Sequence, residues 1–479
     1  MVGRRALGGL VLALVLGSGA AAQVVRYDGH RAVRVSPADL REYRTVLALA
    51  DDILTCEGSG VGTFDVRMSP EHFAAFAGTG IRYEVLLPDM QRHIDRIWAE
   101  DAAARLAEDP SWFVTYRSYA EITARLEQLA AAHPQLATLS TAGTSIQNRA
   151  IPMIRITGPG PTADRPAFLL NANQHAREWI TPMSAMYIVD RLLETYGTDP
   201  RITAIVNSID FYIVPCANPD GYEYSRNTNS QWRKNRRDNP GSCFGVDLNR
   251  NWGYQWGYNN TGSSGDPCSG TFRGSAAFSE PESTALKGLS DMLAAQNRLR
   301  VHWDIHSNGQ QILSPWGYTT SPPPPDLPLM NTLGAIIQSG MGSVRGTFYE
   351  YGQGSVILYQ SNGCTRDYSY AVNGAMAWTI EMGGSSFQPS TSQILPLCQE
   401  ALAGLLPLAE YYIPPVAACY ANCDGSTAAP ALNVADFTCF LNRFAAGESY
   451  ANCDQSTAAP ALNVADFTCF LQSFAGGCP

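Results

Sequence analysis

The stretch "AFLLNANQHAREWITPMSAMYIVDRLLETY" (residues 167–196) joins a short apolar run to a longer segment with a helical pattern. The run "AFLLNAN" predicts a buried strand, and the segment that follows Glu178 predicts a helix. His175 and Glu178 lie at the junction, three residues apart. If Glu178 opens the helix, the two side chains converge at the C-terminal edge of the strand. Proteins of the α/β class commonly bind ligands at this edge of the sheet.

The same alternation of segments continues through the central part of the chain, residues 110–412. The runs "SIDFYIVP", "RVHWDIHS" and "AMAWTIEM" are typical of strands, and "EPESTALKGLSDMLAAQ" has a helical pattern. Strands that alternate with helices predict an α/β fold, in which helices flank the sheet.

Composition and the first residues indicate an exported protein. The chain has 479 residues, of which 45% are hydrophobic and 16% charged, and its net charge of −10 argues against a nucleic-acid partner. Residues 1–22 carry Arg4 and Arg5, an apolar run and small residues, which is typical of a secretory signal cut before Gln23. The apolar run is shorter than the ~20 residues of a membrane span. We therefore expect a secreted protein without a transmembrane segment.

Residues 23–109 form a second unit by their pattern. Short strand-like runs ("HRAVRV", "GTFDVRM", "IRYEVLL") alternate with helix-like stretches such as "PADLREYRTVLALADDI". This pattern predicts an α+β unit of an ordinary domain size. The charged, alanine-rich segment "RHIDRIWAEDAAARLAED" at its end predicts an exposed helix.

The C-terminal residues 419–479 form a small, cysteine-rich repeat module after a proline-containing linker, residues 413–418. The sequence "YANCDGSTAAPALNVADFTCFL" (420–441) recurs with one change at 450–471, and six of the twelve cysteines fall in this module. Equivalent disulfides in the two repeats would join Cys423 to Cys439 and Cys453 to Cys469, leaving Cys419 and Cys478 for the ends.

Each repeat has an oxygen-rich loop before an apolar helix, which suits Ca²⁺. The module resembles a dockerin-type duplicated calcium repeat, and the resemblance implies a docking partner. Two departures are a loop of 13 residues and Pro430 where a turn glycine is expected. The alternative is a cystine-stapled helical hairpin without metal. The candidate calcium ligands are Asp424, Ser426, Asn433, Asp436, Asp454, Ser456, Asn463 and Asp466.

A metal site is also predicted in the central block. An isolated H-x-x-E pair is usually an ordinary surface pair, so a third ligand is needed. Among the seven histidines, His306 ends the apolar run "RVHWDIH", whereas His302 lies deeper in that run and is interpreted as a packed core residue. His175, Glu178 and His306 would form the two-histidine, one-glutamate zinc site of a hydrolase, with one position left for water.

Seven stretches in order carry a resemblance to a known family: "HAREWITP", "NPDGYEYS", "WRKNRR", "GVDLNRNW", "IHSNGQ", "SVILYQSNG" and "TIEMG". Together they closely resemble the metallocarboxypeptidases of the pancreatic carboxypeptidase A/B type, peptidase family M14. The resemblance implies a mixed β-sheet flanked by helices, one Zn²⁺, and peptide substrates with a free C-terminus. It also implies that residues 23–109 are a pro-segment, which is removed by a cut near residues 105–110. On this resemblance, the enzyme is latent until this cut is made.

The resemblance also implies roles for individual residues. Glu381 matches the general base and Arg233 the residue that stabilises the oxyanion. Asp247 matches the partner that orients His175. Residues that match contacts to the substrate, and two cysteines that match a disulfide, complete the set: Asn249 and Arg250 for the terminal carboxylate, Tyr359 as the mobile tyrosine, Arg177 as a secondary contact, and Cys243 with Cys268.

One position departs from the family pattern and another predicts specificity. Asn308 stands where the animal enzymes usually carry a tyrosine. Arg366, seven residues after Tyr359, stands where the family sets the preference for the terminal side chain. An arginine there predicts a preference for acidic C-terminal residues. The alternative is that Asp304 or Asp367 neutralises Arg366 within the protein.

Two other functions are compatible with these residues. One is a zinc amidohydrolase acting on peptidoglycan peptides or amino-acid conjugates, and the other is an inactive binding scaffold. Arg250 and Asn249 argue against substrates without a free carboxylate. The complete ligand set argues against a scaffold without activity. Cys216 and Cys364 fall near the same edge of the sheet and are candidates for a further disulfide.

Overall fold

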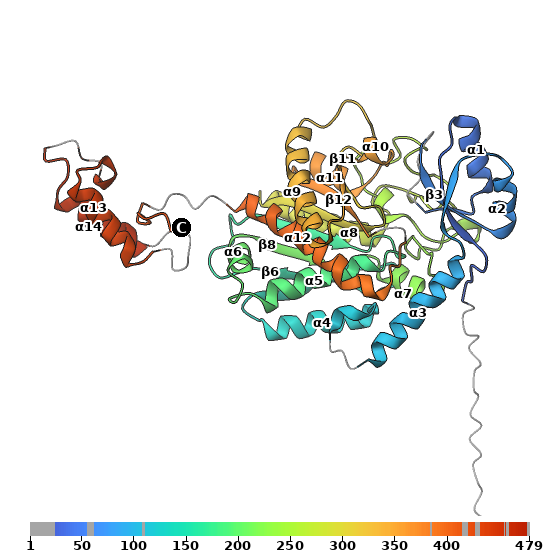
Figure 1. The fold of residues 1–479 in the computed structure, drawn as a ribbon, viewed down its shortest axis with the longest axis horizontal. Coiled ribbons are helices and arrows are strands. Elements are labelled where there is room, and N and C mark those ends of the chain that lie inside the picture. Colours follow the sequence, from blue (N-terminus) through green and yellow to red (C-terminus); the bar gives the residue numbers. More distant parts are fainter. Residues whose placement is uncertain are drawn as a thin grey trace, which may run out of the picture.

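The computed structural model describes residues 24–54, 62–107, 111–383, 386–413, 420–426, 432–454, 456 and 459–476. Figure 1 shows a large central α/β body with a smaller N-terminal unit packed against it. The predicted signal segment, residues 1–22, lies outside the described residues.

An eight-stranded mixed sheet forms the central body, in the order β11-β10-β12-β9-β7-β8-β6-β5. Strands β12, β9, β7 and β8 run parallel in its middle, and antiparallel pairs lie toward the edges. This confirms the predicted mixed α/β class. The strands are β5 (Ala137–Thr144), β6 (Ala150–Ile156), β7 (Ala167–Ala172), β8 (Asp210–Val214), β9 (Leu299–Ser307), β10 (Gln311–Ser314), β11 (Glu350–Gln353) and β12 (Met376–Met382).

Side chains of β7 alternate between two cores, one on each face of the sheet. Phe168 and Leu170 pack into the core that includes Ile180 of α5, whereas Leu169 packs with Leu286 of α8 on the other face. Because both faces are buried, the strand reads as a continuous apolar run. Full burial of one such side chain contributes about 1.5–3 kcal/mol.

Helices cover both faces of this sheet (Figure 1). α5, α9 and α12 contribute to the larger core, and α8 contributes to the smaller one. The helices of the body are α4 (Tyr119–Ala132), α5 (Ile180–Glu194), α6 (Pro200–Ser208), α7 (Pro219–Asn227), α8 (Pro281–Ala295), α9 (Leu327–Arg345), α10 (Gly354–Ile357), α11 (Thr365–Ala371) and α12 (Ile394–Tyr412).

The N-terminal unit has a four-stranded antiparallel sheet in the order β2-β3-β1-β4. Helix α3 was predicted to be exposed, but Met90, Ile94 and Ile97 on one face are buried, so that prediction is wrong for this face. The elements are β1 (Arg31–Val35), α1 (Leu40–Leu49), β2 (Asp52–Ile53), β3 (Phe64–Met68), α2 (Pro70–Ala77), β4 (Tyr83–Leu87) and α3 (Met90–Leu106).

The two repeats form helices α13 (Val434–Ala445) and α14 (Val464–Gly476), which pack through stacked Phe440 and Phe470. The disulfides Cys423–Cys439 and Cys453–Cys469 are present, as predicted. Cys419 and Cys478 lie outside the described residues.

In the central body, Cys243 and Cys268 form the predicted disulfide. The suggestion that Cys216 pairs with Cys364 is wrong, because both are free, buried thiols. Cys216 instead lies 3.5 Å from the Asn173 side-chain oxygen, and Cys364 is 3.7 Å from the Ser361 carbonyl oxygen. Among the described residues, no helix is both long and apolar enough to cross a bilayer.

A buried glutamate next to the start of α8 predicts a pH-dependent stability. Glu282 accepts hydrogen bonds from the backbone N–H of Ile146 (2.9 Å) and from the Asn235 amide (3.1 Å), and burial raises its pKa to about 7. Between about pH 4.5 and 7 the folded form therefore keeps a proton that the unfolded chain releases, so stability falls as pH rises through this window. Over this pH range the unaltered protein loses free energy of unfolding on the order of 2–3 kcal/mol. We expect Glu282→Gln, whose side chain does not ionise, to avoid this loss.

The measurement is the melting temperature of Glu282→Gln relative to the unaltered protein from pH 4.5 to pH 7.5. The difference should shift in favour of the variant as pH rises. Glu127→Gln, at an exposed position of α4, is the control and should show no such trend. A constant difference for Glu282→Gln across the range would contradict the assignment.

Candidate active site

The turn after β7 presents His175 and Glu178 at the end of the sheet. The chain leaves the strand through Asn173, whose φ of 62° is a left-handed conformation that asparagine tolerates well. The Asn173 amide donates to the His175 carbonyl oxygen at 3.1 Å and holds the turn. Glu178 was expected to open the helix, but α5 begins at Ile180, so Glu178 lies in the turn itself.

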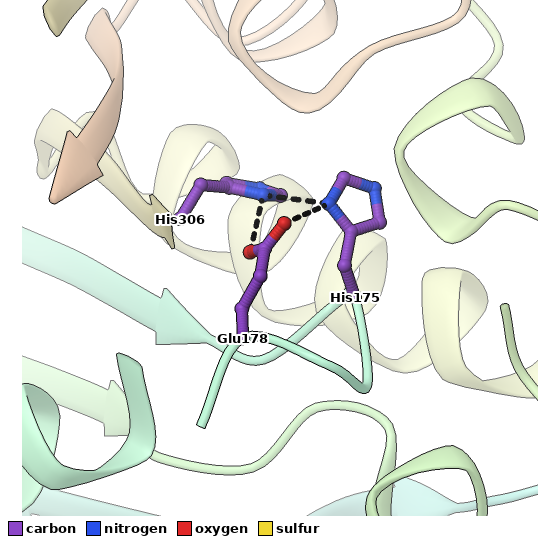
Figure 2. A group of neighbouring side chains, drawn as sticks. All are labelled: His175, Glu178 and His306. Carbon is purple, nitrogen blue, oxygen red and sulfur yellow. Dashed lines mark hydrogen bonds and ion pairs between the residues drawn. The ribbon is translucent and has the colours of Figure 1, made fainter. Parts of the chain in front are cut away.

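His306, the next-to-last residue of β9, completes a cluster with these two side chains (Figure 2). The His175 Nδ1 lies 2.8 Å from Glu178 Oε1 and 2.9 Å from His306 Nδ1, and Glu178 Oε2 lies 3.1 Å from His306 Nδ1. One ligand atom from each residue lies within 4.8 Å of the others, and all three residues are buried. Two imidazole nitrogens and a carboxylate that converge in this way fit the donor set of a hydrolytic zinc ion.

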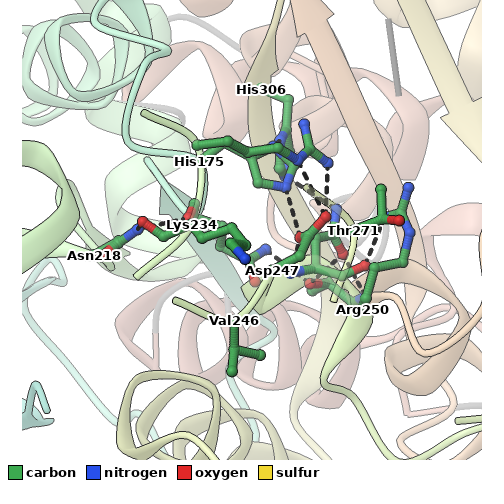
Figure 3. A network of polar contacts seen from close by, with 12 residues as sticks. His175, Asn218, Lys234, Val246, Asp247, Arg250, Thr271 and His306 are labelled. Atoms are coloured by element: carbon green, nitrogen blue, oxygen red, sulfur yellow. Dashed lines mark hydrogen bonds and ion pairs between the residues drawn. The ribbon is translucent and has the colours of Figure 1, made fainter. Parts of the chain in front are cut away.

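Asp247 lies beside the His175 ring (Figure 3), and Arg233 in turn binds Asp247. The His175 Nε2 is 3.0 Å from Asp247 Oδ1, and Arg233 donates to Asp247 Oδ2 from Nε at 3.1 Å and from a terminal nitrogen at 2.9 Å. Burial alone would raise the pKa of Asp247, but the nearby Arg233 and His175 hold it well below its usual value. Asp247 is therefore an ionised acceptor that fixes the His175 ring.

Asn249 and Arg250 follow Asp247 in a short 3-10 turn, Leu248–Arg250, which Asp247 caps by accepting from the Asn249 N–H at 3.0 Å. The Asn249 side chain lies against the cluster, with Nδ2 3.2 Å from His306 Nε2. The Arg250 guanidinium is buried and lies 6.0 Å from the centre of the Tyr359 ring. Three residues predicted to contact the terminal residue of a substrate are thus close together: Asn249 and Arg250 for its carboxylate and Tyr359 as the mobile tyrosine.

Glu381 reaches the same edge of the sheet from β12. This strand runs parallel to β9, and Glu381 is in register with His306. Burial raises the pKa of Glu381 to about 7. A carboxyl group with such a pKa can exchange protons near neutral pH, as a general base requires.

Comparison with known proteins agrees with this geometry. A family model described as zinc carboxypeptidase (Peptidase_M14) matches residues 122–404. The chain belongs to the zinc carboxypeptidase family. It is therefore a metallocarboxypeptidase, a zinc-dependent hydrolase of C-terminal peptide bonds, and the predicted enzyme class is confirmed. The alternative of an inactive binding scaffold is set aside.

Relatives match the carboxypeptidase over most of its length. Carboxypeptidase A1 of Bos taurus is 32% identical over 420 residues, which are 84% of this chain and 98% of the relative. Zinc carboxypeptidase A 1 of Anopheles gambiae is 33% identical over 84% of this chain and 93% of the relative. The crystal structure of carboxypeptidase A from Helicoverpa armigera has a TM-score of 0.69 at 27% identity, over 81% of this chain and 99% of that chain.

Arg366 of the carboxypeptidase lies buried in α11, with two glycines beside it. It donates to Thr379 Oγ1 at 3.1 Å and to Ser361 Oγ at 2.9 Å. A Cβ added to Gly317 or Gly354 would come within 2.7 Å of the guanidinium, so only glycine leaves room for it. Both of these hydrogen-bond partners are neutral hydroxyl groups.

Asp304 and Asp367 were the two candidate internal partners of Arg366, and neither carboxylate forms a hydrogen bond with it. Asp367 Oδ1 lies 3.9 Å from Arg366 Nε, and this carboxylate accepts instead from the backbone N–H groups of Gly317 and Tyr318. Asp304 accepts from Asn171 and Gln174 and lies beside His306. Pairing between Asp304 and Arg366, the alternative left open above, is therefore wrong.

Arg177 is buried under the N-terminal unit. Its guanidinium donates to Asp52 Oδ2 at 3.0 Å and to the Ile53 carbonyl oxygen at 3.3 Å, and it lies 4.1 Å from the centre of the Phe387 ring. The sequence predicted a contact with substrate for Arg177 and did not indicate this contact within the chain. Only the fold brings Asp52 and Arg177, 125 residues apart, together.

Proposed function

We propose that the protein is a secreted zinc carboxypeptidase that preferentially removes acidic C-terminal residues. The observation that carries the proposal is the buried Arg366, whose side-chain hydrogen bonds go to two hydroxyl groups and not to a carboxylate. The nearest carboxylate, Asp367, is 3.9 Å away and accepts its hydrogen bonds from backbone N–H groups, so a substrate carboxylate that binds the guanidinium directly is favoured.

His175, Glu178 and His306 would hold the zinc ion in this proposal. When bound, zinc polarises the scissile carbonyl group and allows water to act as a nucleophile near neutral pH. Glu381 takes the proton of the attacking water and delivers it to the leaving amine. Arg233 stabilises the negative charge that develops on the carbonyl oxygen.

The free C-terminal carboxylate is recognised separately from the side chain. Arg250 and Asn249 bind the carboxylate, since a guanidinium fork matches its two oxygens. Tyr359, near Arg250, closes over the terminal residue. Arg366 then binds the side-chain carboxylate of Glu or Asp and disfavours Lys and Arg by like-charge repulsion.

We expect the protein trimmed of residues 23–109 to hydrolyse blocked dipeptides that end in Glu faster than those ending in Phe or Arg, and a zinc chelator to abolish the activity. Arg366→Met should lower kcat/KM for Glu by about 10²–10³-fold, because an unpaired buried carboxylate costs about 3–4 kcal/mol. It should leave the Phe substrate equal or better. Arg201→Met, at a surface ion pair with Glu410, is the control.

Other outcomes of the same assay have different meanings. Chelator-sensitive release of Phe or Arg in preference to Glu would keep the carboxypeptidase and reject the role of Arg366. No release from any of the three dipeptides would favour the zinc amidohydrolase that acts on peptidoglycan peptides or amino-acid conjugates.

We also propose that residues 23–109 are a pro-segment that keeps the enzyme latent. Asp52 of the N-terminal unit forms an ion pair with Arg177 of the body. Phe387 of the body packs with Leu54, Met90 and other side chains of the N-terminal unit. A cavity of about 440 Å³ remains between the two units, lined by Asp51, Asp52 and Arg67 on one side and by Arg177 and Arg233 on the other. Substrate must reach Arg233, so the N-terminal unit obstructs this approach.

Latency is tested by comparing intact and trimmed protein on the preferred dipeptide. The intact chain should be nearly inactive and a cut near residues 105–110 should activate it; residues 108–110 lie outside the described part of the chain. Asp52→Asn should raise the activity of the intact chain, and trimming, which removes residue 52, should give the same activity from either chain. Asp28→Asn, at an exposed ion pair with Arg26, is the control. Equal activity of intact and trimmed protein would reject latency.

We propose calcium as a ligand of the two C-terminal repeats. In each repeat the last aspartate, Asp436 or Asp466, is buried and accepts from the backbone N–H of the first, Asp424 or Asp454, at 3.3 Å. The side-chain oxygens of Asn422 and Asn452 are buried and have no hydrogen-bond partner among the described residues. Amide and carboxylate oxygens of this kind suit Ca²⁺. A docking partner for the module stays a prediction.

We expect calcium to bind the full-length protein and to raise the melting temperature of its C-terminal module. Titration calorimetry measures the binding, and thermal unfolding in CaCl₂ or in EGTA measures the change in melting temperature. Asp436→Asn together with Asp466→Asn should abolish the heat of binding. Glu448→Gln, an exposed residue of the same module, should leave it unchanged. No calcium-dependent heat in the unaltered protein would favour the disulfide-stapled hairpin without metal.

A further inference from the structure

A second carboxylate lies behind the zinc cluster, on the side of His306. Asp304 precedes His306 by two residues on β9, so both side chains project from the same face of the sheet. Asp304 Oδ2 lies 2.9 Å from His306 Nε2, and both side chains are at most 1% exposed. The sequence had offered Asp304 as a partner for Arg366, and its actual neighbour is a candidate zinc ligand.

The two nitrogens of His306 have different surroundings. Nδ1 faces His175 and Glu178 and is the nitrogen available to a metal ion. Nε2 must then carry the ring proton, because a neutral imidazole has one N–H. The Asn249 Nδ2, at 3.2 Å from Nε2, is itself a donor, since its Oδ1 accepts from the Thr365 N–H at 2.9 Å. Asp304 Oδ2 lies 2.9 Å from Nε2, yet it is a buried oxygen without a hydrogen-bond partner among the described residues. It is therefore the acceptor that a small turn of the ring would bring to this proton.

Asp304 is held in place by its other oxygen. Oδ1 accepts from Asn171 Nδ2 at 2.6 Å and from Gln174 Nε2 at 2.8 Å. The Asn171 Oδ1 lies 2.7 Å from His302 Nε2, and the other nitrogen of His302 lies 2.6 Å from Ser369 Oγ. A chain of buried hydrogen bonds thus runs from α11 to Asp304 Oδ1, and Oδ2 of the same carboxylate lies in ion-pair contact with His306.

We propose that Asp304 is a positioning residue for zinc, which accepts the Nε2 proton of His306 and so fixes the ring with its Nδ1 lone pair toward the metal. The inference rests on the proposed zinc ligands and adds a residue that does not touch the metal or the substrate. A carboxylate behind a histidine ligand fixes the tautomer and strengthens the nitrogen as a donor. Asp247 is hydrogen-bonded to His175, and Asp304 lies in ion-pair contact with His306, so both histidine ligands have a buried carboxylate beside them.

The test is the zinc affinity of Asp304→Asn, measured by competition with a chromogenic chelator on the full-length protein. The substituted amide has one acceptor oxygen for three donors, from Asn171, Gln174 and His306. We expect zinc to bind about 10–100-fold more weakly, the usual effect of removing such a partner. Glu400→Gln is the matched control, because Glu400 is an equally buried carboxylate that is bound by Arg345 and Tyr349 in the body.

The control should lose stability and keep the zinc affinity of the unaltered protein. Unchanged affinity in a folded Asp304→Asn variant would overturn the inference while leaving the zinc site intact. If the unaltered protein binds no zinc, or if His306→Ala binds it equally well, the proposed ligand set itself fails.

A second measurement requires no substitution at Asp304. Proton–nitrogen NMR of the zinc-loaded, ¹⁵N-histidine-labelled protein should show two slowly exchanging ring N–H protons with the low-field shifts of bonds to carboxylates. These belong to Nε2 of His175 and of His306, and each is assigned by its loss in His175→Ala or His306→Ala. A His306 ring proton that exchanges rapidly with water would overturn the inference even if Asp304→Asn does not fold.

Discussion

Complete burial of the ligand cluster is the constraint on which the rest of the site depends. His175, Glu178 and His306 are each at most 1% exposed. A polar atom that does not face the metal position therefore has no access to bulk water and needs a partner within the protein. Asp247 is hydrogen-bonded to the His175 ring, Asp304 lies 2.9 Å from the His306 ring, and the Ser307 N–H lies 3.2 Å from Glu178 Oε2. Each partner is bound in turn by other buried groups.

The parallel strands in the middle of the sheet explain why these groups meet. Strands β7, β9 and β12 run in the same direction, so their C-terminal ends lie at one edge. The register places Asn171 beside Asp304 and His306 beside Glu381. Glu381, the proposed general base, and His306 are therefore positioned by backbone hydrogen bonds of the sheet, which makes their separation insensitive to loop movement.

Much of this arrangement could be predicted from the sequence, because it follows from local patterns. Apolar runs that end in polar residues located β7, β9 and β12, and the spacing of His175 and Glu178 with the scarcity of histidines indicated the cluster. The packing of the central helices follows from the same apolar patterns.

Contacts between distant segments could not be predicted in this way. The ion pair of Arg177 with Asp52 depends on how the N-terminal unit packs on the body. Whether Asp304 contacts Arg366 or His306 depends on the direction of side chains across the sheet. Cys216 and Cys364 both lie near the active edge, but each has its own buried neighbours and they form no disulfide. One signal was available for Asp304: residues two apart on a strand share a face, and His306 is such a neighbour.

The short helix α11 links Arg366, the proposed specificity residue, to the metal cluster. Its first residue, Thr365, donates from its N–H to Asn249 and accepts from Gln174, and its fifth, Ser369, begins the hydrogen-bond chain to Asp304. Arg366 lies between these two residues and projects toward Thr379 and Ser361. Because one turn of helix holds all three side chains, a shift of Arg366 toward a bound carboxylate is resisted by hydrogen bonds that also position His306 and Asn249. If Arg366 binds the terminal side chain as proposed, this rigidity requires the side-chain carboxylate to come to Arg366 and not the reverse.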